Sequence, residues 1–463
     1  MAIAIPQHFY LGGGLDETII SPVAAALLGL CVAGVLFLQR RPAIVCALIG
    51  ALLIPAGNVV VLAGVHLVPV RFIALFGVVR LLISKFVGSG GLFVGGLDTI
   101  DRAVLGWALG HAVAFSLLWH TGGALVNQCG FLLGSLGIYF LLRHLIRNEK
   151  DARIVIQVLV IVVLVNGAEM VYEQFYDRNL FALLGGITIS SIREGHVRAQ
   201  GAFQHPLLAG SFGGVSLPLF AWLWKTGKHK AWAVVGVVSS AVMALCTWSS
   251  TPLFVLLGGV GAMFVWPFRR RMRKIRWGIV VTLLVLQLFM KAPVWFLIQR
   301  VELSGTSGYH RAILVDNFIR HFGEWWLVGT KDMSTWDFET WDTSNEFVSQ
   351  GETGGLLTFA FFLAIICRGF QKAGRARKRV QGDRDQEWCF WLLGVAMFAN
   401  ILAYFGVSYW DQTQVGWFAF LALIIAATGS QAIAVPNKRV QPVSDLNAPF
   451  SELTVESPHS VPV

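Results

Sequence analysis

The chain has 463 residues, of which 56% are apolar and only 13% are charged, and its formal net charge is +10. A soluble protein carries roughly 25% charged residues, so this composition leaves too few charges to cover a water-facing surface and excludes a soluble globular protein. We assign the positive balance to the cytoplasmic loops of a membrane protein, where lysine and arginine set orientation, and not to nucleic-acid binding.

Apolar segments of about twenty residues recur along the chain, and a helix of that length crosses a hydrocarbon layer of about 30 Å. Helices satisfy their own backbone hydrogen bonds in lipid, whereas the short alternating segments of a β-barrel are not seen in the sequence. We therefore predict an all-α polytopic integral membrane protein with about 12–13 transmembrane helices. The predicted spans are 19–38, 43–63, 66–84, 103–120, 124–142, 154–172, 207–224, 231–248, 252–268, 277–296, 351–367, 388–407 and 415–434.

The basic residues predict how these spans are oriented. With the N-terminus outside, every alternate segment between spans is basic, and these inner segments hold most of the 36 lysine and arginine residues. The positive-inside rule then predicts thirteen spans in a transmembrane domain of residues 1–434, with the C-terminus inside. Residues 435–463 are rich in Pro, Ser and Val without periodicity, which predicts a disordered cytoplasmic tail.

The six cysteines lie in or beside apolar segments and none has CxxC spacing, so neither a disulfide nor a metal site is expected. The N-terminus has no basic region followed by a small-residue cleavage site, so no signal peptide is expected.

Two of the predicted outer segments are long, and long polar loops between helices are usually functional. The first, 173–206, gathers Arg193, His196, Arg198 and His205 on the side where the orientation rule expects few basic residues. A local anionic partner is therefore predicted, and the guanidinium fork matches a phosphate or a diphosphate. The alternative is that these arginines pair with lipid phosphates or with Glu194.

Two glycines of the same region, Gly201 and Gly210, are expected to let the backbone come close to a ligand.

The second long outer segment, 297–350, lies between the tenth and eleventh spans. Apolar residues near helical spacing over 309–322 predict an amphipathic helix at the membrane interface, with Arg311 on it. Four tryptophans follow, for which an interfacial aromatic belt and stacking against sugar rings are both open: Trp325, Trp326, Trp336 and Trp341.

Acidic residues stand where this segment returns to the membrane. Asp342, Glu346 and Glu352 lie at that point, where an ionisable group is expensive and more often functional. Such a carboxylate could activate an acceptor hydroxyl or bind a cation.

Four sequence motifs, in this order, resemble a known family of membrane proteins, the O-antigen ligase and O-antigen polymerase-like proteins. They are RAQGAFQHPLLAG at 198–210, TWSSTPLFVLLGG at 247–259, SGYHRAILVDNFIRHFGEWWLVG at 307–329 and DTSNEFVSQGETGGLL at 342–357. The resemblance runs from about Arg198 to Phe370, and the preceding spans match the family only as hydrophobic helices.

The resemblance implies a GT-C-like helical bundle that acts as a metal-independent glycosyltransferase without a nucleotide sugar or other cofactor. It implies a multi-pass protein of the bacterial plasma (inner) membrane, with its active site facing the periplasm or exterior. The donor would be an undecaprenyl-pyrophosphate-linked glycan and the acceptor a sugar hydroxyl of a growing polysaccharide. Further expected partners are the bilayer and polysaccharide export or chain-length proteins, and no nucleic acid.

By position in the motifs, Arg198 and Arg311 are expected to grip the donor diphosphate and stabilise it as it leaves. The remaining candidate residues come from the same outer segments. His310, Glu346 and Glu352 are candidate catalytic bases, and the candidate substrate-binding residues are Arg193, His205, Trp341, Asp342 and Asn345.

The chain departs from the family at one position, because the ligases usually have a histidine directly before the loop-end asparagine and this chain has Ser344. This favours a polymerase of polysaccharide repeat units over a ligase. The main alternative from another class is a lipid-linked oligosaccharide transporter, which would carry polar sites at the bilayer midplane. Arg71 is the clearest charge predicted well inside a span.

Overall fold

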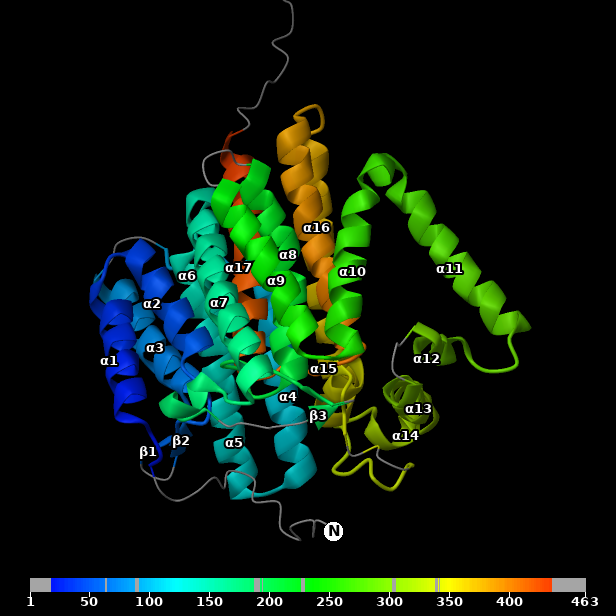
Figure 1. Cartoon of the computed structure of the whole chain (residues 1–463), viewed down its shortest axis with the longest axis horizontal. Coiled ribbons are helices and arrows are strands. Elements are labelled where there is room, and N and C mark those ends of the chain that lie inside the picture. Colours follow the sequence, from blue (N-terminus) through cyan, green and yellow to red (C-terminus); the bar gives the residue numbers. More distant parts are fainter. Residues whose placement is uncertain are drawn as a thin grey trace, which may run out of the picture.

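The computed structural model describes residues 18–62, 65–87, 91–186, 192–193, 195–225, 230–301, 305–337, 340 and 342–434. Helices run up and down between two ends of the molecule (Figure 1), as the apolar segments predict. The predicted tail 435–463 and the candidate Trp341 lie outside the described residues.

The first half of the chain forms helices along the predicted spans, with three consecutive helical elements sharing the span 124–142, and two short antiparallel hairpins. The elements are α1 (Pro22–Phe37), α2 (Arg40–Leu53), β1 (Val60–Leu62), β2 (Val65–Leu67), α3 (Pro69–Val87), α4 (Thr99–Trp119), α5 (Gly122–Leu132), the π-helix η1 (Leu133–Gly137), α6 (Ile138–Leu145), α7 (Glu149–Tyr176), the 3₁₀ helix η2 (Leu180–Leu184), β3 (Ile192–Arg193) and β4 (His196–Val197).

The second half completes the bundle and adds a small group of helices at the outer end. The elements are α8 (Pro206–Lys225), α9 (Lys230–Cys246), α10 (Ser250–Phe264), η3 (Trp266–Arg271), α11 (Met272–Phe289), η4 (Val294–Leu297), α12 (Ile298–Val301), α13 (Gly305–Arg320), α14 (Phe322–Trp325), α15 (Glu346–Arg379), α16 (Arg384–Tyr404) and α17 (Asp411–Ala434).

Several of these helices are long and apolar enough to cross a membrane. Seven of the described helical segments meet this criterion, or eight if the bent pair α10 and η3–α11 is one span. Helices α1 and α9 are apolar but shorter. The all-α, multi-pass membrane architecture is therefore clear. Each of the thirteen predicted spans overlaps a helix, but that of 43–63 is too long, because α2 ends at Leu53.

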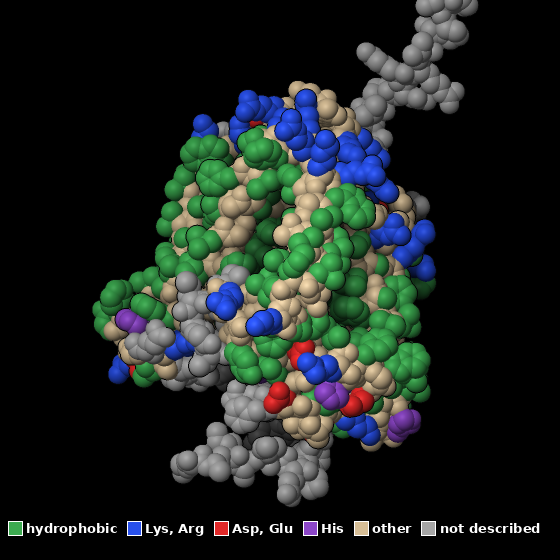
Figure 2. Space-filling view, turned by 90° about the vertical axis from the view of Figure 1, so that its right-hand side faces the viewer, with side chains coloured by type: hydrophobic (Ala, Val, Ile, Leu, Met, Phe, Trp, Pro, Cys, Tyr) green, Lys and Arg blue, Asp and Glu red, His purple; other side chains and the backbone are tan. Residues whose placement is uncertain are grey.

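Ion pairs at one end of the bundle join segments that the charge pattern places on the same side. Arg40 on α2 contacts Asp151 on α7 (2.7 Å), and Lys225 at the end of α8 contacts Asp385 on α16 (3.1 Å). Arg269 in η3 contacts Glu387 on α16 (3.1 Å). Lysine and arginine gather at this end in Figure 2, so we call it the basic end.

The opposite end, here called the outer end, joins the segments predicted to lie outside. The backbone nitrogen of Ser21 donates to Asn58 Oδ1 (3.0 Å), and Asn58 Nδ2 donates to the carbonyl of Leu184 (2.7 Å). These contacts link three of the predicted outer segments, so the alternation read from charge agrees with the arrangement of the chain.

Helix α11 stands apart from the bundle in Figure 1. It leaves α10 at an angle of 73°, and none of its side chains is buried by the described residues. The chain then returns to the outer end through α12, α13 and α14.

The predicted amphipathic helix is present as α13. Its Leu314 and Phe318 are buried together with Trp325, whose ring stacks on Phe318 at 3.9 Å. Trp325 is therefore a core residue of the outer loop and not part of an aromatic belt, whereas Trp326 is exposed.

The helix that returns to the membrane, α15, starts earlier than the sequence predicted. Helix α15 begins at Glu346, five residues before the predicted start, and is interrupted at Gly355, whose φ is 69°. The break lets the outer loop pair with the helix backbone: Thr330 N donates to the carbonyl of Glu352 (2.8 Å) and Leu356 N to that of Trp326 (2.8 Å). A Cβ on Gly355 would lie 2.6 Å from the carbonyl oxygen of Leu327, so this position requires glycine.

Candidate functional site

Arg198 is held at the outer end by a turn that is distant from it in the sequence. It follows the β3–β4 hairpin, in which Arg193 pairs with His196. Its guanidinium donates to Ser249 Oγ (2.8 Å) and to the carbonyl of Thr247 (3.4 Å), both in the turn between α9 and α10. Arg198 therefore has a defined orientation before any ligand binds.

The segment after Arg198 is tied to the outer ends of α7 and α17. The backbone nitrogens of Gln200 and Gly201 donate to Glu173 Oε2 (2.9 and 3.1 Å), and Ala202 N donates to Asn166 Oδ1 (2.9 Å). The side chain of Gln412 donates to the carbonyl of Ala202 (2.8 Å). These bonds hold the backbone that carries the arginine.

The glycines expected to admit a ligand instead admit other parts of the chain. Gly201 has a φ of 60°, and a Cβ there would lie 2.6 Å from Asn166 Oδ1. A Cβ on Gly210 would lie 2.7 Å from side-chain atoms of Pro252 and Thr247. The ligand interpretation of both glycines is therefore wrong: they permit close packing of the segment on α7 and α10.

Arg311 comes from α13 and reaches the same region. It is 6% exposed, and its guanidinium donates to the carbonyl of Gly406 (3.2 Å) in the turn between α16 and α17. Gly406 packs against Thr251 so closely that a Cβ would lie 2.5 Å from Thr251 Cγ2. Because Thr251 is two residues from Ser249, the anchors of Arg198 and Arg311 meet at one junction.

Electrostatics also connect the arginines. Burial lowers the pKa of Arg198 from its usual value, and the charge of Arg193 lowers it further. Burial lowers the pKa of Arg311 to about 10, with Asp342 raising it and Arg193 lowering it. The charge of Arg193 thus acts on both guanidinium groups. Such a cluster favours an anion with several oxygens.

His205 lies beside this cluster as a neutral imidazole. Burial and then the charge of Arg198 lower its pKa to about 4. Its Nδ1 accepts from the backbone nitrogen of Leu207 (3.1 Å) at the start of α8, so the ring proton is on Nε2. His205 can therefore donate a hydrogen bond to a ligand from Nε2.

The loop end at 342–346 is held by the same α16–α17 turn. Ser408 Oγ donates to the carbonyl of Thr343 (2.6 Å), and Tyr409 N donates to Glu346 Oε2 (2.6 Å). Asn345 is buried and caps α15, its Oδ1 accepting from Val348 N (3.2 Å). Asn345 thus positions the helix.

The two candidate glutamates differ in how they are held. Glu346 is 5% exposed and its second oxygen, Oε1, accepts from Gln350 Nε2 (2.9 Å), so both of its oxygens are engaged by N–H donors. Glu352 is partly exposed and accepts from Thr343 Oγ1 (2.7 Å) through one oxygen. Glu346 is arranged as an anchor, and Glu352 is the more accessible carboxylate.

His310 lies next to Arg311 and contacts the loop end. Its Nε2 lies 3.0 Å from the carbonyl oxygen of Asp342, which also accepts from Ser344 N (2.9 Å). Since a carbonyl only accepts, Nε2 carries a proton, and a neutral ring then has its lone pair on Nδ1. The histidine thus reaches the position beside Ser344, and its Nδ1 can accept a proton.

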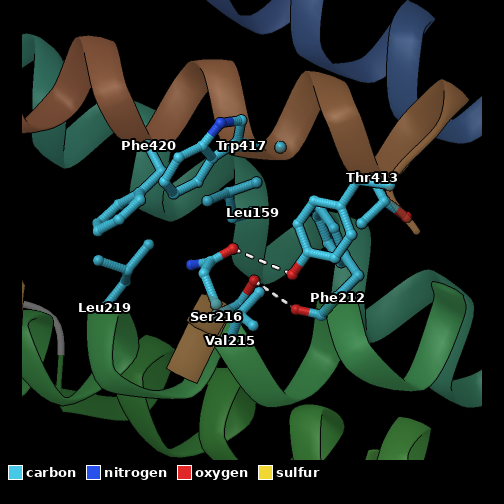
Figure 3. A pocket seen from close by; sticks show the side chains of 11 residues that line it. Leu159, Phe212, Val215, Ser216, Leu219, Thr413, Trp417 and Phe420 are labelled. Atoms are coloured by element: carbon cyan, nitrogen blue, oxygen red, sulfur yellow. Dashed lines mark hydrogen bonds between the residues drawn. The ribbon is translucent and has the colours of Figure 1, made fainter. Parts of the chain in front are cut away.

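A small cavity lies below the α16–α17 turn, between α7, α8 and α17 (Figure 3). Its volume is about 20 Å³, which is enough for one water molecule. Tyr409 donates to Asn400 Oδ1 (3.0 Å) at its edge, and Thr413 and Ser216 also line it. This cavity is too small for a substrate; it can hydrate the polar groups that hold the turn.

Arg71 was predicted to lie well inside a span, but it is close to the outer end of its helix. It is in the first turn of α3, and its guanidinium donates to the carbonyl of His66 in β2 (3.0 Å) at the outer end. The expectation of a charge deep in the membrane at this position is therefore wrong.

Sequence reasoning missed the α16–α17 turn, although Gly406, Ser408 and Tyr409 contact three parts of the site. The available signal was a cluster of polar residues in a short outer turn, FGVSYWDQ at 405–412. Comparison with known proteins adds no assignment, because no family model matches the chain and no curated protein matches it.

Proposed function

We propose that the protein is a polysaccharide polymerase with a GT-C-like bundle, which transfers an undecaprenyl-pyrophosphate-linked glycan to a sugar hydroxyl. The observation that carries this proposal is the common junction of Arg198 and Arg311, with Arg193 acting on both. Fixed guanidinium groups at the membrane surface suit a lipid diphosphate, because the fork binds phosphate oxygens bidentately.

The reaction follows from these groups. The acceptor hydroxyl oxygen attacks the anomeric carbon of the donor glycan, and the bond from that carbon to the diphosphate oxygen breaks. Undecaprenyl diphosphate leaves as an anion, and Arg198 and Arg311 stabilise the charge that develops on it. The proton of the acceptor hydroxyl passes to a general base.

His310 is the best-supported base among the candidates. Because Nε2 donates to Asp342, Nδ1 is the ring nitrogen that can accept a proton, and His310 is adjacent in sequence to Arg311. His310 also shares the carbonyl of Asp342 with the backbone nitrogen of Ser344, and Ser344 is the position at which the ligases of the resembled family have their histidine. Glu352 is the second candidate, because one of its oxygens is bound by Thr343 and its side chain is partly exposed.

The orientation of the site is proposed from charge. We assign the basic end to the cytoplasm by the positive-inside rule, and this supports a position of the arginine junction at the periplasmic or exterior face of a bacterial plasma membrane. The lipid-linked donor would be presented at this face.

Two alternatives remain beside the polymerase. A ligase would use the same donor site and pass the glycan to another acceptor. The position of His310 near Ser344 is the observation that favours a ligase. A lipid-linked oligosaccharide transporter would need a polar site at the midplane. Arg71, the clearest charge predicted inside a span, donates to the carbonyl of His66 at the outer end, which gives such a site no support.

Deletion of the gene followed by analysis of lipid-linked glycans tests the proposal. A polymerase predicts that single lipid-linked repeat units accumulate on the outer leaflet and disappear when the wild-type chain is restored. Accumulation of long lipid-linked chains would indicate the ligase. Accumulation of repeat units on the inner leaflet would indicate the transporter and contradict the proposal.

A further inference from the structure

An aromatic pair lies directly beside the arginine junction. The imidazole of His196 stacks on the indole of Trp248, with ring centroids 3.6 Å apart and planes at 2°. His196 is opposite Arg193 in the β3–β4 hairpin and two residues before Arg198, while Trp248 lies between Thr247 and Ser249, the two residues that hold Arg198.

Trp248 occupies a backbone conformation that does not suit it. It follows the end of α9 with a φ of 44°, in the left-handed region where glycine or asparagine is usual. A bulky aromatic residue is strained there, because its Cβ approaches the backbone too closely. The stacked imidazole of His196 contacts the indole in this place, and Trp248 N donates to the carbonyl of Leu245 (3.1 Å).

The indole is nevertheless open to solvent. It is 44% exposed, and His196 covers one of its faces. An aromatic residue that is strained, stacked on a neighbouring ring and still substantially exposed is suited to receive a flat apolar surface.

We infer that Trp248, backed by His196, is a stacking platform for a pyranose ring of the diphosphate-linked glycan. The inference rests on the proposed function and deepens it. A donor whose diphosphate is bound by Arg198 places its first sugars within reach of residues adjoining Ser249. The C–H face of a pyranose is apolar and packs on an indole, whereas the diphosphate is bound by charge. The two parts of the donor are thus recognised by different residues.

The test compares two ligands on the purified full-length protein in detergent. One is the lipid-linked glycan extracted from the deletion strain, and the other is undecaprenyl diphosphate without sugar. We expect Trp248→Asn to bind the glycolipid about tenfold more weakly, with binding of undecaprenyl diphosphate unchanged. Asparagine tolerates a positive φ, so this variant should fold at least as well as the wild type.

Two controls make the result specific. Trp248→Phe keeps an aromatic face and should stay within about threefold of wild-type glycolipid binding. Trp224→Asn removes an indole of similar exposure, 47%, near the end of α8 that is farthest from Arg198. This substitution should change the affinity for neither ligand.

Two outcomes would overturn the inference. Equal weakening of both ligands by Trp248→Asn would mean that Trp248 acts only by positioning Arg198. Unchanged glycolipid binding would make it an ordinary interfacial tryptophan. Failure of the wild-type protein to bind undecaprenyl diphosphate would instead contradict the proposed function.

Discussion

His310 Nε2 lies 3.0 Å from the carbonyl oxygen of Asp342, and this contact decides which nitrogen of the ring can act as a base. The carbonyl accepts a hydrogen bond from Nε2–H, so Nδ1 is the ring nitrogen left to accept a proton. The same bond ties α13, which carries Arg311, to the loop end that precedes α15.

This geometry predicts that His310→Gln keeps the fold and loses the reaction. The glutamine amide can still donate to Asp342, but it cannot accept the proton of the acceptor hydroxyl. We expect the turnover rate to fall by about 100-fold or more, measured as polymer formed from lipid-linked repeat units. His321→Gln is the matched control, because His321 follows α13 and stacks on Trp336 away from Asp342, and it should retain activity. A rate for His310→Gln above about a tenth of wild type would exclude His310 as the base and leave Glu352.

Arg198→Ala and Arg311→Ala should each abolish polymer formation while the protein still accumulates in the membrane. Arg→Lys at either position should also fail, because an ammonium group does not reproduce the planar fork. Gel analysis of surface polysaccharide and blotting of membranes measure the two effects. Arg320→Ala serves as control, since Arg320 is on the same helix, is exposed and pairs with Asp316. Normal polymer in either alanine variant would remove the proposed donor site.

Gly355→Ala should destabilise the protein because its φ of 69° is unfavourable for alanine and the new Cβ would meet the Leu327 carbonyl at 2.6 Å. We expect a loss of about 1–3 kcal/mol, measured as a lower midpoint of thermal unfolding in detergent. Gly374→Ala in the same helix is the comparison, because nothing lies within 4 Å of a Cβ there. That substitution should be neutral or stabilise by about 0.5–1 kcal/mol. Equal effects of the two substitutions would contradict the role assigned to the helix break.

His205 predicts a dependence of stability on pH. Its pKa is about 4 in the folded protein against an ordinary value of 6.5, so the unfolded chain binds more protons between these values. Stability is therefore lost as pH falls through this window, by about 2 kcal/mol at pH 5 relative to neutral pH.

The variant His205→Asn can still accept from Leu207 N but does not titrate, so its unfolding midpoint should decrease less between pH 7 and pH 5 than that of the wild type. Parallel pH dependence in the two proteins would show that His205 is already protonated or does not contribute.

The sequence predicted the helices and their alternation between the two ends because both depend on local composition. Apolar runs form helices in lipid, and basic clusters such as 269–276 mark one end whatever the helices pack against. Arg198 could be singled out for the same reason, since basic residues on the outer side break that local rule, whereas Arg311 was singled out by the family resemblance. The helix start at Glu346 was missed because Asn345 acts as its cap, a role visible only once Val348 N is seen to donate to it.

Only the tertiary structure decided how the outer segments meet. The sequence contains Ser249, Gly406 and Tyr409 in separate short turns, and nothing in its periodicity relates them. Packing brings these turns together around Arg198, Arg311 and Glu346, because buried guanidinium and carboxylate groups must find hydrogen-bond partners from whichever backbone lies nearby. The chain by itself therefore determined a multi-pass helical membrane protein with unusual outer arginines, and the fold determined which residues hold them.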